Sequence, residues 1–212
     1  MTSISPSELH RVTELTLNRP WLSAKDIQTV CQKVRDQKVY GVCVYGSRIE
    51  LAASILADTD LKLTALIGGA FGNADSDVKR YETEVAIDYG AQEIEFDLNA
   101  GRLKDGDHKY VLRELRDVVE AAEERIVKVG LSWLTREEML LACELVLDSG
   151  AHFIASRFED LEALKLCRKA VGPKFGIKAM TSTPEAPGEL AGLIEAGATR
   201  LGVYGEFYPF VI

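Results

Sequence analysis

The apolar residues of this chain fall into short runs separated by longer amphipathic stretches. Between the runs they recur at helical spacing, as in Val111, Leu115, Val118 and Ala122. The short runs are rich in β-branched and aromatic residues, and they predict strands at 12–17, 40–45, 62–67, 93–98, 126–131, 152–156, 175–179 and 200–204. Strands that alternate with helices along the whole chain are typical of a parallel α/β fold.

The ends of the predicted helices carry their own signals. Ser23 with Asp26, and Thr135 with Glu138, form capping-box patterns at two helix starts. Three junctions share one order, in which a helix ends in glycine and alanine and a strand begins after a short polar link. They lie at Gly90, Gly150 and Gly197. This recurrence indicates copies of one βα unit.

Eight such units in 212 residues predict a compact TIM barrel that forms a single domain over 1–212. An open doubly wound sheet is the competing fold, but it usually needs fewer units in one domain. After the eighth predicted strand only the short apolar tail 206–212 remains, so we expect the last helix to be missing. The tail would cover the exposed flank or dock on a second copy of the chain, which would give a homodimer.

Charge and composition narrow the range of partners. A net charge of −8 and a pI near 5.0 argue against nucleic acid and against an anionic membrane surface. No apolar run approaches the roughly 20 residues that span a bilayer, and the N-terminus lacks the pattern of a secretion signal. The four cysteines lie in apolar contexts without CxxC pairing, and the three histidines are far apart. We therefore expect buried thiols, a cytoplasmic location, and neither a metal nor a cofactor.

The fourth predicted strand alternates acidic with apolar residues, so that Glu93, Glu95 and Asp97 share one face. An acidic stripe in an apolar strand is costly unless the carboxylates meet cations or water. The fifth and seventh predicted strands each carry one lysine among apolar residues, Lys128 and Lys178. If these faces point into the barrel, lysines and carboxylates meet in a low-dielectric interior.

Two interpretations of this cluster stay open. A lysine beside another cation in an apolar wall has a lowered pKa, so its amine attacks a carbonyl and forms an imine while a carboxylate moves protons. In the other interpretation the charges only fill the barrel interior as an ion-pair network. A variant of this second view places the lysines outside the barrel, between helices.

The sequence resembles the deoxyribose-phosphate aldolase family from about residue 13 to 204. The matching segments are collinear and include 41–45, 66–68, 71–73, 90–95, 118–122, 142–145, 150–154, 170–173, 178–179 and 194–202. The resemblance implies a TIM barrel and a class I aldolase that works through a lysine imine without a metal. Its implied partner is a small aldehyde or a sugar phosphate, and its implied role is carbohydrate catabolism.

The resemblance also places the family's site on this chain. The family's second lysine is Lys178, its strand-four aspartate reads Glu95, and its first-strand aspartate reads Glu14. Its Schiff-base lysine falls on Ala155, which cannot form an imine. Lys128 is gained where we expect family members to have an apolar residue. A lysine gained while another is lost suggests a migrated nucleophile or charge compensation for the acidic strand.

The segments that hold phosphate in the family also differ here. Residues 156–160 shorten a glycine-containing segment of the family, 180–183 replace its glycine-rich turn, and 203–205 stand where the family offers serines to phosphate. These differences weaken the case for a phosphorylated substrate. Arg157 replaces those contacts or simply stands in solvent. We expect the catalytic residues to be Lys178, Lys128, Glu95 and Asp97. We expect the substrate-binding residues to be Glu14, Cys43, Asn73 and Arg157.

Three functions compete on this basis. The first is a deoxyribose-phosphate aldolase-like carbon–carbon lyase in which Lys128 or Lys178 forms the imine and Glu95 or Asp97 moves protons. The second is a catalytically inactive relative that keeps the barrel as a binding or assembly module. The third is a different lyase or an isomerase acting on a non-phosphorylated keto acid.

Overall fold

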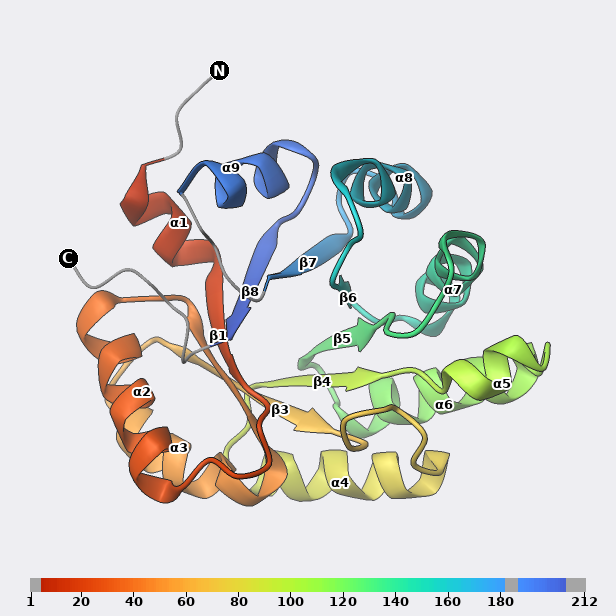
Figure 1. Ribbon diagram of the computed structural model, residues 1–212. Helices are drawn as coiled ribbons and strands as arrows, with labels where there is room; N and C mark the ends of the chain where they lie inside the picture. Colours follow the sequence, from red (N-terminus) through yellow and green to blue (C-terminus); the bar gives the residue numbers. More distant parts are fainter. Residues whose placement is uncertain (1–4, 182–186, 205–212) are drawn as a thin grey trace.

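The computed structural model describes residues 5–181 and 187–204, and in this part of the chain eight parallel strands close into one barrel (Figure 1). Each strand pairs with the next along the chain, and the last pairs with the first. The strands are β1 (Thr13–Leu17), β2 (Gly41–Tyr45), β3 (Lys62–Ile67), β4 (Glu93–Asp97), β5 (Ile126–Gly130), β6 (Phe153–Ser156), β7 (Gly176–Thr181) and β8 (Arg200–Tyr204). The predicted TIM barrel is confirmed, with strand ends that differ by one or two residues.

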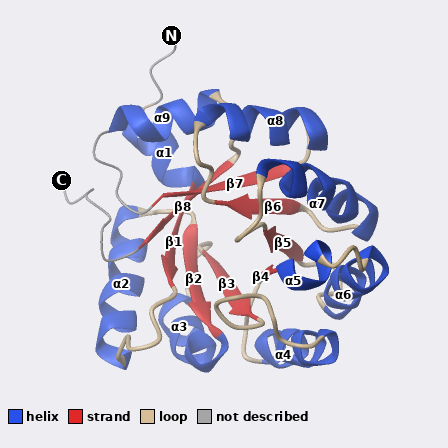
Figure 2. Cartoon of the chain, turned by 45° about the vertical axis from the view of Figure 1, so that its right-hand side comes forward, coloured by secondary structure: helices blue, strands red, loops and turns tan. Residues whose placement is uncertain are grey.

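The helices form a ring outside the strands (Figure 2). They are α1 (Pro6–Val12), α2 (Ala24–Gln37), α3 (Ile49–Leu56), α4 (Ser76–Asp88), α5 (Ala100–Lys104), α6 (His108–Ala121), α7 (Arg136–Ser149), α8 (Leu161–Val171) and α9 (Pro187–Glu195), with the 3₁₀ turn η1 at Gly46–Arg48. None of the described helices is long and apolar enough to cross a bilayer. The expected loss of a final helix concerns residues 205–212, which lie outside the described part of the chain.

The local signals in the sequence act where they were expected. Ser23 and Thr135 form complete capping boxes at the starts of α2 and α7. The glycines of the three repeated junctions adopt positive φ angles of 102° at Gly90, 85° at Gly150 and 116° at Gly197. A left-handed backbone is easily adopted only by glycine, so each junction turns the chain from a helix into the next strand.

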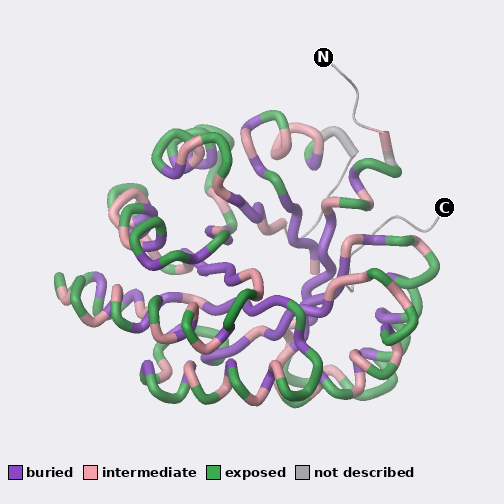
Figure 3. The backbone as a smooth tube through the Cα atoms, turned by 180° about the vertical axis from the view of Figure 1, so that it is seen from behind, coloured by how far each residue is buried: buried purple, intermediate pink, exposed green. Residues whose placement is uncertain are grey.

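Two kinds of core lie on the two faces of the strands. Apolar side chains such as Ile94, Phe96, Val127 and Ile177 are fully buried in the apolar core that the strands share with the helices. In the burial view the strands lie mostly buried inside helices that expose their outer faces (Figure 3). The residues of opposite parity point into the barrel, where branched apolar side chains are usual. Here many of them are charged.

Candidate active site

Six charged side chains meet inside the barrel and form a closed ion cluster among the described residues. Each has a side chain that is at most 9% exposed. Its carboxylates come from β1 and β4 and its cations from β5, β7 and β8. The members are Glu14, Glu93, Glu95, Lys128, Lys178 and Arg200. The three negative charges therefore equal the three positive charges.

Lys178 crosses the barrel interior from β7. Its Nζ lies 2.8 Å from Glu14 Oε1 and 2.7 Å from Glu95 Oε2. Gly202 on the neighbouring strand β8 leaves space for this side chain, because a Cβ at position 202 would lie 2.6 Å from Lys178 Cε. The ammonium group is thus shared between two carboxylates of different strands.

Lys128 occupies the same interior from β5. Its Nζ forms an ion pair with Glu14 and donates to Thr64 Oγ1 at 2.9 Å. It also lies 2.9 Å from Glu93 Oε2 and 3.5 Å from Glu95 Oε2. Both lysines therefore share Glu14 and Glu95, and neither amine is free.

Arg200 completes the cluster from the start of β8. Its Nη1 donates to Glu93 Oε2 at 3.0 Å, and its guanidinium lies 3.5 Å from the ring centroid of Tyr40 and 4.8 Å from that of Phe153. The Tyr40 hydroxyl donates to the other oxygen of Glu93. Every carboxylate in the barrel interior thus has more than one donor.

The number of partners decides the protonation of this cluster. Burial alone would raise the pKa of Glu14 and lower the pKa of Lys128 and of Lys178. The opposite charges outweigh burial, so the pKa of Glu14 lies well below its ordinary value and the pKa of each lysine lies above its own. The two lysines are therefore ammonium ions.

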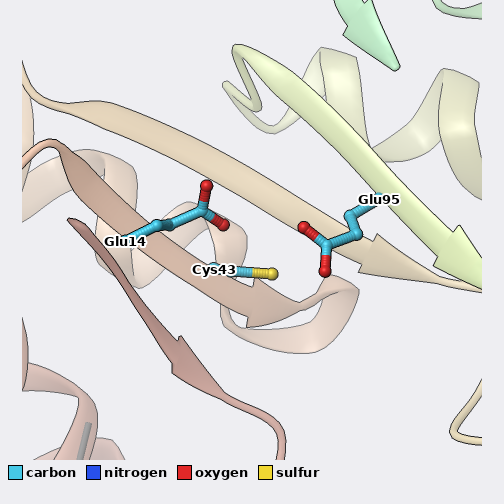
Figure 4. Close-up of side chains that lie close together, drawn as sticks. All are labelled: Glu14, Cys43 and Glu95. Carbon is cyan, nitrogen blue, oxygen red and sulfur yellow. The ribbon is translucent and has the colours of Figure 1, made fainter. Parts of the chain in front are cut away.

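Glu14, Cys43 and Glu95 point toward one another and have potential metal ligand atoms within 4.8 Å (Figure 4). Burial raises the pKa of the Cys43 thiol well above its ordinary value, and a thiol binds metal as the thiolate. Lys178 already occupies oxygens of both carboxylates. A metal at this position would have to displace that ammonium group, so the donor set does not suit a cation.

A cleft of about 150 Å³ lies where the strands end and opens to the outside. Glu95 and Asp97 line it from β4, and Ser132, Ala155 and Arg157 line it from the other side of the barrel. No lysine is among the described residues that line the cleft, and residues 182–186 and 205–212 contain none in the sequence. The carboxyl ends of the strands are where barrel enzymes carry their active sites.

Asp97 is the carboxyl group of this cleft with an altered proton affinity. Burial and the nearby charge of Glu95 raise its pKa, although the Ser132 hydroxyl and N–H both donate to it. Gly130 leaves room for the group, since a Cβ at position 130 would lie 2.0 Å from Asp97 Oδ1. Asp97 is therefore held in a fixed place and binds a proton more readily than an ordinary aspartate.

Comparison with known proteins assigns this barrel to a family. The deoxyribose-phosphate aldolase of Alkaliphilus oremlandii (strain OhILAs) is 36% identical over 196 residues, with 88% of each chain covered. That of Thermococcus gammatolerans (strain DSM 15229 / JCM 11827 / EJ3) is also 36% identical over 196 residues, with 87% of each chain covered. This chain belongs to the deoxyribose-phosphate aldolase family.

Solved structures share the fold of this chain. The structure described as "QR15, an Aldolase" matches with a TM-score of 0.86 and 26% identity, covering 94% of this chain and 93% of the other. A putative deoxyribose-phosphate aldolase from Coccidioides immitis matches with a TM-score of 0.89 at 24% identity, covering 97% and 85%, which shows the shared fold. No family model matches the chain.

The structure brings three of the expected catalytic residues together and places the fourth nearby. Lys178 and Lys128 both contact Glu95 in the ion cluster, and Glu95 also reaches the cleft. Asp97 lines the cleft but is not bonded to either lysine. The hypothesis of a lysine with a lowered pKa is wrong for this geometry, because carboxylates surround both amines.

The expected substrate-binding residues are divided between three places. Glu14 and Cys43 are buried in the barrel interior and are not among the residues that line the cleft. Arg157 is exposed and lines the cleft. Asn73 is exposed in the loop between β3 and α4, and it is also not among the lining residues. Of the four, Arg157 alone is placed to contact a ligand in the cleft.

Some partners in the site were not predicted from the sequence. Arg200 starts β8, where the alternation Arg200, Gly202, Tyr204 faces inward, so the period of the strand would have revealed it. Tyr40 lies just before β2, and Ser132 lies in the turn after β5. Neither carries a sequence signal, because turn and strand-end side chains contact residues that are remote in the chain.

Proposed function

We propose that this chain catalyses aldol-type carbon–carbon cleavage of a small hydroxyaldehyde or hydroxyketone by proton transfer, without a lysine imine. The observation that supports this proposal is the pair of carboxyl groups on one face of β4. Glu95 and Asp97 both line the cleft. Glu95 forms ion pairs with the ammonium groups of Lys128 and Lys178, whereas Asp97 has a raised pKa. An ion-paired carboxylate beside a carboxyl group with a raised pKa suits a base beside an acid.

The lysines are poorly placed for an imine. That step requires an uncharged amine that reaches the carbonyl carbon. Lys128 and Lys178 are fully buried and have raised pKa values because each is surrounded by carboxylates. Ala155 stands in the cleft wall at the position that the family resemblance gives to the imine-forming lysine. The family's reaction therefore needs another route through this site.

The two carboxyl groups match the two proton transfers of an aldol cleavage. They are two residues apart on one strand, so about 7 Å separates their Cα atoms. Glu95 accepts the proton of the substrate's β-hydroxyl group, and Asp97 in its protonated form donates to the carbonyl oxygen. The bond between the α and β carbons then breaks, which yields an aldehyde and an enol. The reverse order of steps gives aldol addition.

The substrate is a small polar molecule. The cleft volume of about 150 Å³ is below that of typical ligand pockets, roughly 300–1,000 Å³. The relatives' name indicates deoxyribose phosphate as the first substrate to test. Arg157 lines the cleft and suits an anionic group at the far end of such a substrate.

Hydrogen exchange tests the proposal without knowledge of the acceptor. Acetaldehyde in heavy water exchanges its α hydrogens when an enzyme forms its enol, and proton NMR follows the loss of signal. We expect the wild type to accelerate exchange, and Glu95→Gln and Asp97→Asn each to lower the rate by about 10²–10⁴-fold. Glu144→Gln, an exposed carboxyl group on α7, is the matched control and should keep the wild-type rate. Equal rates in all four proteins would contradict the proposal.

A binding or assembly module is the second candidate. It is favoured by the absence of lysine among the described lining residues of the cleft, where the relatives' resemblance places a nucleophile at Ala155. This candidate predicts binding of deoxyribose phosphate in a titration calorimeter, with neither cleavage of that compound nor exchange of acetaldehyde. That combination of results would replace the first proposal with the second.

A further inference from the structure

We propose that Phe71 and Trp133 form an aromatic subsite at the mouth of the cleft, which binds a flat apolar substituent, such as an aryl group, of the ligand. The inference rests on the proposed function only for the carbonyl-bearing part of that ligand. Phe71 belongs to the loop after β3, and Trp133 belongs to the turn after β5. Their chain neighbours Ala70 and Ser132 both line the cleft.

The two rings are exposed although they contact each other. Phe71 is 60% exposed and Trp133 is 67% exposed. The ring centroids lie 6.1 Å apart and the ring planes meet at 45°. This separation lies in the range of favourable aromatic pairs, but the tilted arrangement leaves ring surface to solvent. Large aromatic side chains that stay exposed together mark a binding surface more often than an isolated exposed residue does.

The backbone at Trp133 strengthens this interpretation. Its φ angle is 65°, in the left-handed region that bulky side chains rarely adopt. The turn is fixed on both sides, because Ser132 donates to Asp97 and Thr135 caps α7. Glycine would satisfy this turn without strain. A tryptophan held in a strained and exposed position is explained when its ring contacts a ligand.

The size of the cleft explains why a ligand would reach this far. A volume of about 150 Å³ accepts only a small head group, so any larger part of the molecule leaves through the mouth. There it meets the loops that carry Phe71 and Trp133. Trp21 differs from this pair, since its ring lies 5.3 Å from the guanidinium of Arg19 and none of its immediate neighbours lines the cleft.

A matched pair of aldehydes tests the subsite. Hydrocinnamaldehyde and propanal have the same carbonyl end, but only the first carries a phenyl group. The chain has two tryptophans, so Trp21→Phe leaves Trp133 as the one tryptophan whose fluorescence is followed. We expect hydrocinnamaldehyde to quench Trp133 fluorescence and to bind about tenfold more tightly than propanal in a titration calorimeter.

The variants should remove this preference without weakening the binding of propanal. In Trp133→Gly and Phe71→Ala, the affinity ratio of the two aldehydes should fall toward one, while the affinity for propanal stays unchanged. Tyr81→Ala removes an equally exposed aromatic ring on α4 and should keep the ratio. Trp133→Gly should also raise the melting temperature, because glycine relieves the left-handed strain. A lower melting temperature with equal loss of both affinities would show that Trp133 is structural and would overturn the subsite.

The subsite and the proposed function fail in different ways. Hydrocinnamyl alcohol has the phenyl group without the carbonyl, so its binding at Trp133 supports the subsite even when no acetaldehyde exchange occurs. Exchange activity without any preference for the aryl aldehyde overturns the subsite and leaves the proposed function intact. Sedimentation measurements of the oligomeric state test whether a second copy of the chain covers the two rings. A dimer that Trp133→Gly converts into monomers, with an unchanged aldehyde ratio, would show that a second copy occupies these rings and would also overturn the subsite.

Discussion

The centre of the barrel and its mouth use charged residues in opposite ways. At the centre, three carboxylates meet three cations. The pKa of Glu14 is lowered and the pKa values of both lysines are raised, so the charged form of each group is favoured. At the mouth, the Asp97 carboxyl group has the Ser132 hydroxyl and N–H as donors and forms no ion pair within the described residues, and its pKa is raised. Arg157 forms no ion pair within the described residues. The Glu14 carboxylate, buried among cations, stays ionised, whereas the Asp97 carboxyl group at the edge of the cleft keeps the ability to exchange a proton.

A second buried pair shows that partner number makes this difference. Lys79 of α4 and Glu114 of α6 are fully buried and 2.7 Å apart. Burial is the larger effect there, so the pKa of Lys79 is lowered and that of Glu114 is raised. Lys79 also donates to the carbonyl oxygens of Gly72 and Asp97, which links this pair to the end of β4. One carboxylate does not compensate burial of a lysine, while several do.

The largest expected effect is on stability and comes from removing one carboxylate of the ion cluster at the centre of the barrel. Glu14→Gln removes one negative charge and leaves Lys128 and Lys178 fully buried with fewer carboxylates. We expect the free energy of unfolding to fall by about 3–5 kcal/mol, measured by urea denaturation. Glu144→Gln on the surface of α7 is the control and should change it by less than about 0.5 kcal/mol. A loss below about 1 kcal/mol in Glu14→Gln would show that the cluster is not a closed network.

The stability of the centre should also depend on pH in a defined direction. Because the folded-state pKa of Glu14 is lowered, its contribution is complete above the ordinary value of 4.5 and is lost as the pH falls through the lower folded value. Unfolding free energies measured from neutral to acid pH should therefore decline below about pH 4.5. In Glu14→Gln the decline should be shallower. An equal slope in both proteins would assign the acid sensitivity to other carboxylates.

A smaller change at the mouth should lower activity without disturbing the ion cluster at the centre of the barrel. In Gly130→Ala the new Cβ would lie 2.0 Å from Asp97 Oδ1, so the carboxyl group must move. A displacement of about 1 Å at a catalytic group costs about 10²-fold in rate, and we expect that loss in acetaldehyde exchange. Ala151→Gly, at the repeated junction before β6, is a control of similar size outside the cleft. Unchanged exchange in Gly130→Ala would show that Asp97 is not a catalytic group.

The rate of acetaldehyde exchange should depend on pH in the direction opposite to that expected for an aspartate acting as a base. Asp97 acts in its protonated form, so exchange should be fastest below its raised pKa and fall about tenfold per pH unit above it. Asp97→Asn should remove this limb of the profile, since an amide does not titrate. The same group makes folding less favourable as the pH rises through the interval between the ordinary and the raised pKa. A rate that rises through that interval would show that Asp97 acts as a base.

Much of this fold could be predicted because its signals are local. The glycine–alanine junctions at Gly90, Gly150 and Gly197 and the capping boxes at Ser23 and Thr135 fix where helices end and begin. The resemblance and the strand periodicity together predicted the barrel and the inward parity of its charged residues.

The protonation of the site could not be predicted in the same way. Parity alone indicated that Lys128 and Lys178 approach Glu95, but the pKa of each lysine depends on how many carboxylates surround it. Glu14 reaches both lysines across the barrel, over a separation that no sequence pattern encodes. The Ser132 donors to Asp97 come from a turn, and turn contacts depend on the folded geometry. Local patterns therefore placed the residues, and long-range contacts decided their chemistry.

Borohydride trapping of wild type and Ala155→Lys tests the central claim most directly. Both proteins are incubated with acetaldehyde and reductant, and peptide mass analysis locates any reduced adduct. The side chain at position 155 lines the cleft and pairs in register with Lys178, so a lysine there has substrate access that the two native lysines lack. We predict no adduct on Lys128 or Lys178 of the wild type and an adduct at position 155 of the variant. An adduct on Lys128 or Lys178 of the wild type would contradict the account.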